Sequence, residues 1–210
     1  MKEIVEIRWH GRAGQGVVTA AKLLAESALA AGQYFQAFPE YGPERSGAPI
    51  QAFTRIGNVP VRIHSSITKP DIVVVMDPTL LAQPPAEGEG AGGFGDIPDV
   101  THGLTEDGII LVNTSQEPAE IRELLHLKGR QIYTVNATHI ALETIKRPIP
   151  NTPILGALLK IEPIIPIEQF TEILRTSMSK KLKPEVVEGN IQAVRRAFEE
   201  IKAETVAVGA

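Results

Sequence analysis

The spacing of apolar residues along the chain predicts strands that alternate with helices. Aliphatic residues dominate three short segments, residues 71–76, 108–113 and 131–135. Strands without polar alternation are typical of a parallel sheet that is covered by helices on both faces. Apolar residues recur at helical spacing in three further segments, residues 17–31, 117–126 and 138–146. This order predicts an α/β fold with a doubly wound, mostly parallel sheet.

Shorter strands are predicted in the first part of the chain. Residues 3–9 alternate between polar and apolar side chains, and residues 33–38 and 51–56 have the composition of strands. Gly57-Asn58 has the composition of a tight turn, so we expect residues 59–63 to return as the second arm of a hairpin.

The last part of the chain has a helical pattern. Thr152 is expected to be the N-cap, and Pro153 a first-turn residue, of a short helix over residues 154–160. Two longer helices are predicted at residues 166–179 and 184–202, after which the chain is expected to fray.

Composition defines the domain organisation. Residues 83–103 are rich in proline, glycine and acidic residues, and we interpret them as a surface insertion. The sequence contains no internal repeat and no heptad pattern. We interpret residues 1–210 as a single domain, in which residues 162–203 form a helical C-terminal extension.

Charge and residue usage exclude several classes of function. The net charge of −4 argues against nucleic acid or an anionic membrane as a partner. The chain has neither the apolar run of about 20 residues that a bilayer requires nor a signal-peptide pattern, so we expect it to be cytoplasmic. It contains no cysteine, and thus no thiolate nucleophile or cysteine ligand for an iron–sulfur cluster. The five histidines show no metal-binding spacing, so no metal site is expected on this chain.

The segment GRAGQG, residues 11–16, is the first candidate for chemistry. It stands between a predicted strand and a predicted helix, which brings backbone N–H groups and the positive end of a helix dipole to one point. Gly14 and Gly16 let a ligand approach the backbone, and Arg12 and Gln15 can add side-chain donors. This combination predicts a site for phosphate or pyrophosphate. A tight turn with close helix packing would explain the same glycines, and both interpretations remain open.

A dinucleotide site is the less favoured form of anion binding. Ala13 stands where the Rossmann pattern G-x-G-x-x-G requires its second glycine, and the second predicted strand does not end in the expected acidic residue.

Two other segments carry polar residues between prolines, which restrict the backbone. Residues 38–49 form a proline- and glycine-rich loop with four side chains suited to a ligand or partner, Tyr41, Glu44, Arg45 and Ser46. Solvated charge explains this loop equally well. Asn151 and Thr152 could bind substrate, but helix capping is the simpler explanation. Among the histidines, His10 is of most interest because it adjoins the glycine segment.

The sequence resembles the gamma subunits of the 2-oxoacid:ferredoxin oxidoreductases, especially the pyruvate type. The resemblance begins at GRAGQG and YGPERSGAP and covers most of residues 3–161. It continues through four more segments, AFTRI (52–56), DIVVVMDPTLL (71–81), EDGIILVNT (106–114) and IKRPIPNTPILGALLK (145–160).

The resemblance implies a division of labour among subunits. The complete enzyme would convert a 2-oxoacid, coenzyme A and oxidised ferredoxin into an acyl-CoA, carbon dioxide and reduced ferredoxin. Thiamine diphosphate with Mg²⁺ would lie on the alpha and beta subunits, and 4Fe–4S clusters on the beta and delta subunits. This chain would not be catalytic alone, and its lack of cysteine agrees with that arrangement.

The resemblance also implies roles for residues of this chain. Coenzyme A would be bound by five residues, Gly11, Arg12, Gly14, Gln15 and Gly16. Tyr41, Glu44, Arg45 and Ser46 would face the coenzyme or a partner subunit. Three alternatives remain: a purely structural subunit that braces the complex, the equivalent subunit of an enzyme for another 2-oxoacid, and an independent dinucleotide-dependent oxidoreductase.

Overall fold

The computed structural model describes residues 2–40, 47–81 and 99–204. Within these residues the chain forms a seven-stranded sheet in the order β2-β3-β1-β4-β5-β6-β7. The strands are β1 (Ile4–Arg12), β2 (Tyr34–Glu40), β3 (Pro49–Gly57), β4 (Ile72–Val75), β5 (Ile109–Asn113), β6 (Gln131–Val135) and β7 (Lys202–Ala203). The helices are α1 (Val17–Ala30), η1 (Pro78–Leu81), α2 (Pro118–Leu125), α3 (Ala137–Ile145), α4 (Pro153–Ile161), α5 (Ile167–Met178) and α6 (Pro184–Glu200).

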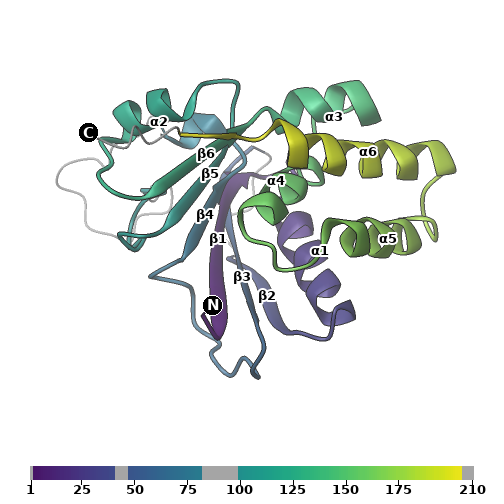
Figure 1. Cartoon of the computed structure of the whole chain (residues 1–210), viewed down its shortest axis with the longest axis horizontal. Helices are drawn as coiled ribbons and strands as arrows, with labels where there is room; N and C mark the ends of the chain where they lie inside the picture. Colours follow the sequence, from purple (N-terminus) through teal and green to yellow (C-terminus); the bar gives the residue numbers. More distant parts are fainter. Residues whose placement is uncertain (1, 41–46, 82–98, 205–210) are drawn as a thin grey trace, which may run out of the picture.

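The sheet is mixed, with a parallel centre. The neighbours β1, β4, β5 and β6 are parallel, whereas β3 runs antiparallel to both β1 and β2, and β7 runs antiparallel to β6. Helices cover both faces, with α1 and α4–α6 on one side and α2 on the other (Figure 1). The predicted α/β fold with a doubly wound, mostly parallel sheet is therefore confirmed.

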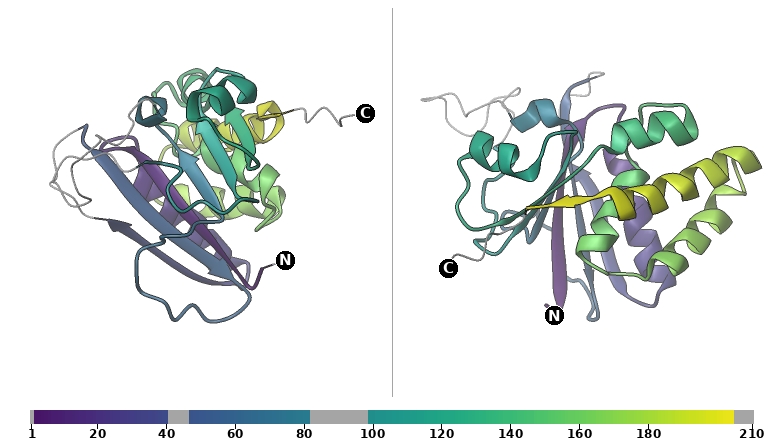
Figure 2. Two further views of the ribbon diagram at one scale, coloured as in Figure 1. Left: turned by 90° about the vertical axis from the view of Figure 1, so that its left-hand side faces the viewer. Right: turned by 45° about the horizontal axis from the view of Figure 1, so that its top comes forward.

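Two apolar clusters, one on each face, explain the unalternating strands. Val74 of β4 joins Trp9 and the residues of α1 and α3–α6 in the larger cluster. Val73 and Val75 point the other way, into a smaller cluster with η1 and α2. A strand that is buried on both faces needs apolar side chains at every position. The C-terminal helices α5 and α6 contribute Phe170 and Val194 to the larger cluster, where α6 packs on α3 and α4, and α5 on α1 and α6 (Figure 2).

The predicted hairpin arm at residues 59–63 is wrong. These residues form no strand, because both edges of β3 are already paired, one with β1 and the other with β2. The segment after Gly57 instead crosses the sheet and is held by the buried Arg55. The Arg55 Nη1 group donates a hydrogen bond to the carbonyl oxygen of Ser65 at 2.8 Å.

The structure also corrects where two predicted elements end, the first strand and the last helix. β1 continues three residues beyond the predicted strand, which ended at Trp9, to Arg12, so Gly11 and Arg12 lie in the sheet. The last helix was predicted to reach residue 202 but ends at Glu200, and the next residues form β7, where Ala203 pairs with Tyr133. Most of the predicted insertion at residues 83–103 lies outside the described residues. None of the helices in the described part of the chain has the length and apolar composition of a membrane span.

Candidate functional site

The carboxyl ends of β1 and β4 meet at a point where the chain leaves the sheet in two directions. After β1 the chain passes into α1 on the face of the larger cluster, and after β4 it passes into η1 on the opposite face. The two ends are adjacent, since Met76 N donates to the carbonyl oxygen of His10 at 2.7 Å. In open α/β sheets, ligands bind in the crevice at such a topological switch point. The glycine bend, residues 11–16, lies there.

The bend reverses the chain between β1 and α1. Gly14 and Gly16 have positive φ angles of 101° and 80°, which residues with a side chain rarely adopt. Gly16 is the N-cap of α1. Gly14 is exposed, and a Cβ atom added to it would have no neighbour within 4 Å. A ligand can therefore approach the backbone closely at Gly14.

Several backbone donors at the bend have no acceptor among the described residues. These are the N–H groups of Gly14, Gly16, Val17, Val18 and Thr19. No acidic side chain stands in the first turn of α1 to offset the positive end of its dipole. The bend thus offers a group of N–H donors and a partial positive charge at an open edge of the sheet, which is the arrangement that binds phosphate.

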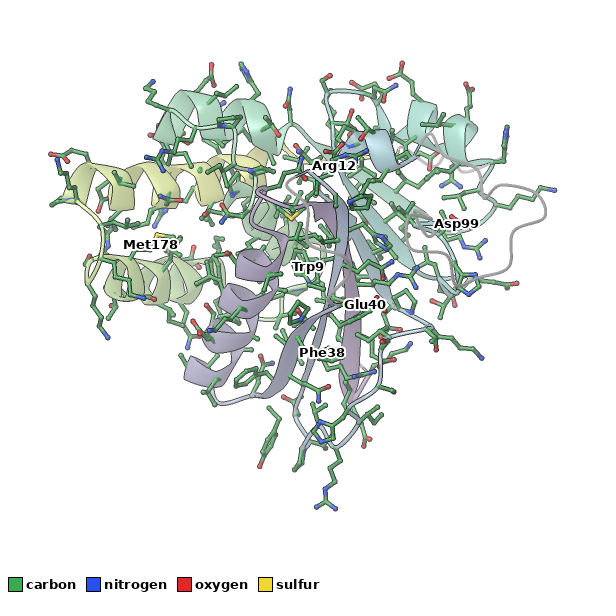
Figure 3. All side chains as sticks on the ribbon, turned by 180° about the vertical axis from the view of Figure 1, so that it is seen from behind. Trp9, Arg12, Phe38, Glu40, Asp99 and Met178 are labelled. Carbon is green, nitrogen blue, oxygen red and sulfur yellow. The ribbon has the colours of Figure 1, made fainter. Side chains whose placement is uncertain are left out.

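The side chains of the bend make hydrogen bonds within the chain. Gln15 accepts a hydrogen bond from Arg12 N at 2.8 Å and donates one to Asp77 Oδ2 at 2.7 Å, so its amide braces the end of β4. Arg12, at the end of β1 (Figure 3), donates to Thr79 Oγ1 at 2.9 Å and to the carbonyl oxygen of Gly47 at 3.2 Å. Gln15 is therefore a brace, and Arg12 is a partly engaged donor.

Asp77 introduces a negative charge beside the bend. Burial raises the pKa of this carboxyl group. Hydrogen bonds from the side chain and backbone of Thr79 and from Gln15, together with the charge of Arg12, outweigh burial and lower its pKa below the ordinary value. Asp77 is consequently ionised, and Arg12 lies close enough to balance its charge, at 3.4 Å between Arg12 Nε and Asp77 Oδ2.

Asn151 reaches the bend from another part of the chain. A Cβ atom at Gly16 would lie 2.8 Å from Asn151 Nδ2, so the Asn151 side chain packs directly on the glycine. Thr152 occupies the predicted N-cap of α4 but makes no capping hydrogen bond, and its hydroxyl donates to Asn151 Oδ1 at 3.2 Å. The capping explanation is wrong for both side chains.

The residues that follow the second predicted motif in the sequence lie at the same edge of the sheet. Tyr41, Glu44, Arg45 and Ser46 lie outside the described residues. The residue that follows them, Gly47, accepts the hydrogen bond from Arg12, and Ala48 accepts one from Ala13 N at 2.9 Å. Gly47 and Ala48 therefore lie beside the glycine bend.

His10 does not take part in the site. It is buried on β1, where its Nε2 atom accepts a hydrogen bond from Arg8 Nε at 3.0 Å. Burial, and secondarily the charge of Arg8, lower the pKa of His10 to about 3, so the imidazole is neutral. Across the described residues, no three His, Cys, Asp or Glu side chains are grouped in a way that could hold a metal ion.

The fold and the bend define an α/β chain with a strand–glycine–helix junction at the carboxyl edge of a mostly parallel sheet. The family model for pyruvate ferredoxin/flavodoxin oxidoreductase matches residues 6–200, and the chain belongs to this family.

Similar proteins agree with this placement. Pyruvate synthase subunit PorC of Thermotoga maritima is 47% identical over 201 residues, which cover 96% of each chain. The common gamma subunit of the pyruvate/ketoisovalerate oxidoreductases of Pyrococcus furiosus is 45% identical, over 93% of this chain and 96% of that one. The crystal structure of the Thermotoga maritima pyruvate oxidoreductase subunit PORC superimposes with a TM-score of 0.79 at 44% identity, over 97% of this chain and all of the other.

Proposed function

We propose that the chain is the gamma subunit of a 2-oxoacid:ferredoxin oxidoreductase that acts on pyruvate. Its family and its relatives named pyruvate synthase subunit PorC support this proposal. The reaction would convert pyruvate, coenzyme A and oxidised ferredoxin into acetyl-CoA, carbon dioxide and reduced ferredoxin. In this proposal, the iron–sulfur clusters and thiamine diphosphate with Mg²⁺ belong to the alpha, beta and delta partners, and the complex is cytoplasmic. The chain has no cysteine, which agrees with clusters that are ligated by other subunits.

Within this complex, the chain contributes to the coenzyme A site. The observation that carries this part of the proposal is the group of N–H donors at the glycine bend, which find no acceptor in the part of the chain that the structure describes. These donors fit a phosphate group of the coenzyme, and the open space at Gly14 lets that phosphate reach them. The chain would fix the nucleotide end of the coenzyme, so that the thiol is directed toward the partner subunits.

The choice of 2-oxoacid lies mainly on other subunits. The Pyrococcus furiosus relative is named as a common subunit of pyruvate and ketoisovalerate oxidoreductases. One gamma subunit that serves enzymes for two substrates does not itself decide between them. The same reasoning applies to this chain, for which pyruvate is favoured by the PorC relatives.

A purely structural bracing role is the alternative. It is favoured by one observation, the use of the Gln15 side chain to join the bend to Asp77. The two functions differ in what a change at the bend should affect. Bracing predicts that the complex fails to assemble, and coenzyme binding predicts weaker binding of coenzyme A by an assembled complex.

Gly14→Ala, with Gly32→Ala as its control, separates these functions. The two glycines flank α1, have φ angles of 101° and 83°, and leave an added Cβ without neighbours within 4 Å. Both substitutions therefore cause similar backbone strain, but only a methyl group at Gly14 would obstruct the phosphate. In the assembled complex, Gly14→Ala should raise KM for coenzyme A about tenfold, the effect of losing about 1.4 kcal/mol of binding, with KM for pyruvate unchanged.

Gly32→Ala should leave KM for coenzyme A and KM for pyruvate near the parent values. An unchanged KM for coenzyme A in Gly14→Ala would remove the bend from the coenzyme site. Loss of assembly in Gly14→Ala alone would favour the bracing role.

A further inference from the structure

Asp77 has more hydrogen-bond partners than its turn requires. It follows β4 and is buried, and its Oδ1 atom accepts hydrogen bonds from Thr79 N at 2.9 Å and Thr79 Oγ1 at 2.6 Å. This pattern is an Asx turn, which connects β4 to η1. An asparagine oxygen would accept the same two bonds, so the turn does not explain the negative charge.

The second carboxylate oxygen connects β4 to the glycine bend. Asp77 Oδ2 accepts the hydrogen bond from Gln15 Nε2 at 2.7 Å and lies 3.4 Å from Arg12 Nε. A second route runs through Thr79, whose hydroxyl donates to Asp77 and accepts from Arg12 Nε at 3.2 Å and Arg12 Nη2 at 2.9 Å. Asp77 therefore holds Arg12 both directly and through Thr79.

Arg12 is held in this arrangement, but not all of its N–H donors are used. Its side chain is 29% exposed, and its Nε, Nη1 and Nη2 groups each make a hydrogen bond. An arginine has five N–H donors, so one N–H on each Nη atom has no acceptor within the part of the chain that the structure describes. Holding an arginine in place before a ligand arrives reduces the rotamer entropy that is lost on binding.

We propose that Asp77 is a positioning residue of the coenzyme A site. Its carboxylate holds the Arg12 guanidinium beside the amides of the glycine bend, so that the two remaining N–H donors face a phosphate group of the coenzyme. Asp77 acts through Arg12 and does not touch the ligand. This inference rests on the proposed function, since it needs a phosphate at the bend.

Asp77→Asn tests this role, and Asp71→Asn provides a matched control. The two aspartates flank β4, their side chains are 11% and 16% exposed, and each accepts a hydrogen bond from a backbone N–H group, Thr79 N or Glu6 N. Asp71 stands at the opposite end of the strand from the bend. Both substitutions keep a side-chain oxygen and remove a charge, so a general loss of stability would affect both variants.

The readout is equilibrium binding of coenzyme A to the assembled complex without pyruvate, together with KM for coenzyme A. Asp77→Asn should raise Kd and KM about tenfold, as expected when a charge-assisted contact to phosphate is weakened, and kcat should remain near the parent value. Asp71→Asn should leave Kd unchanged. Asp77→Glu, which keeps the charge, should bind more tightly than Asp77→Asn. Equal Kd values for Asp77→Asn and the parent would overturn the inference.

Arg12→Ala separates this inference from the function on which it rests. Arg12→Ala should itself weaken coenzyme A binding, and Asp77→Asn should cause no further loss in that background. Additive losses would show that Asp77 does not act through Arg12. If Arg12→Ala binds coenzyme A like the parent, the inference is wrong, because Asp77 then has no arginine to position. The coenzyme site itself is wrong only if Gly14→Ala also binds like the parent. If the complex that carries Asp77→Asn does not assemble, Thr79→Val provides the test instead. This substitution removes the hydroxyl that Arg12 contacts, so it should raise Kd for coenzyme A severalfold.

Discussion

Gly156→Ala is expected to lower the free energy of unfolding by about 2 kcal/mol. Gly156 lies where α4 crosses α6, and a Cβ atom there would be 2.0 Å from the carbonyl oxygen of Val194. The helices would have to move apart, at a cost of about 3 kcal/mol in a packed core. Alanine recovers about 1 kcal/mol through its higher helix propensity. Chemical denaturation followed by circular dichroism measures the difference.

Two further substitutions calibrate this effect. Gly189→Ala places a Cβ atom 2.7 Å from the carbonyl oxygen of Thr144, a less severe contact, and should cost less than Gly156→Ala. Glu199→Ala, on the exposed side of α6, should change stability by no more than about 0.5 kcal/mol. A Gly156→Ala chain as stable as the parent would mean that α4 and α6 do not approach each other this closely.

The buried His10 is expected to make the fold sensitive to acid. Burial and the neighbouring Arg8 lower its pKa to about 3, from the value near 6.5 of an unfolded chain. Between these two values the unfolded state binds a proton that the folded state does not, so stability falls as the pH falls through this window. The contribution amounts to about 2 kcal/mol between pH 7 and pH 5.

His10→Gln isolates this contribution. A glutamine oxygen can accept the hydrogen bond that Arg8 Nε donates to His10 Nε2, but the side chain does not titrate. The variant should therefore lose about 2 kcal/mol less stability than the parent between pH 7 and pH 5. Parallel pH profiles for the parent and His10→Gln would show that His10 takes up its proton in the folded state.

Local patterns in the sequence predicted the parallel centre of the sheet and its helices. The aliphatic runs that became β4 and β5 are explained by burial on both faces, a property visible in each segment alone. The hairpin arm at residues 59–63 failed because the pairing of β3 with β1 and β2 is a long-range property. β7 was missed because its two residues are too few to show a strand pattern.

The candidate site was predicted in position but not in its internal contacts. The glycine bend was found because its strand–glycine–helix order is local. Asp77, the partner of Gln15, is 62 residues away in the sequence. The sequence did contain one signal for Asp77, an acidic residue directly after a buried parallel strand. Such residues stand at the ligand-binding edge of a sheet. The contact between Asn151 and Gly16 had no such signal, since only the folded chain brings α4 to the bend.

Amide hydrogen exchange in the assembled complex most directly tests the claim that the glycine bend holds coenzyme A. The N–H groups of residues 14 and 16–19 have no acceptors among the described residues, so they should exchange rapidly without the coenzyme. Coenzyme A should slow their exchange, because each donor that binds a phosphate oxygen is protected. Pyruvate alone should leave them unchanged. If a saturating concentration of coenzyme A leaves exchange at these residues as fast as before, the coenzyme is bound elsewhere.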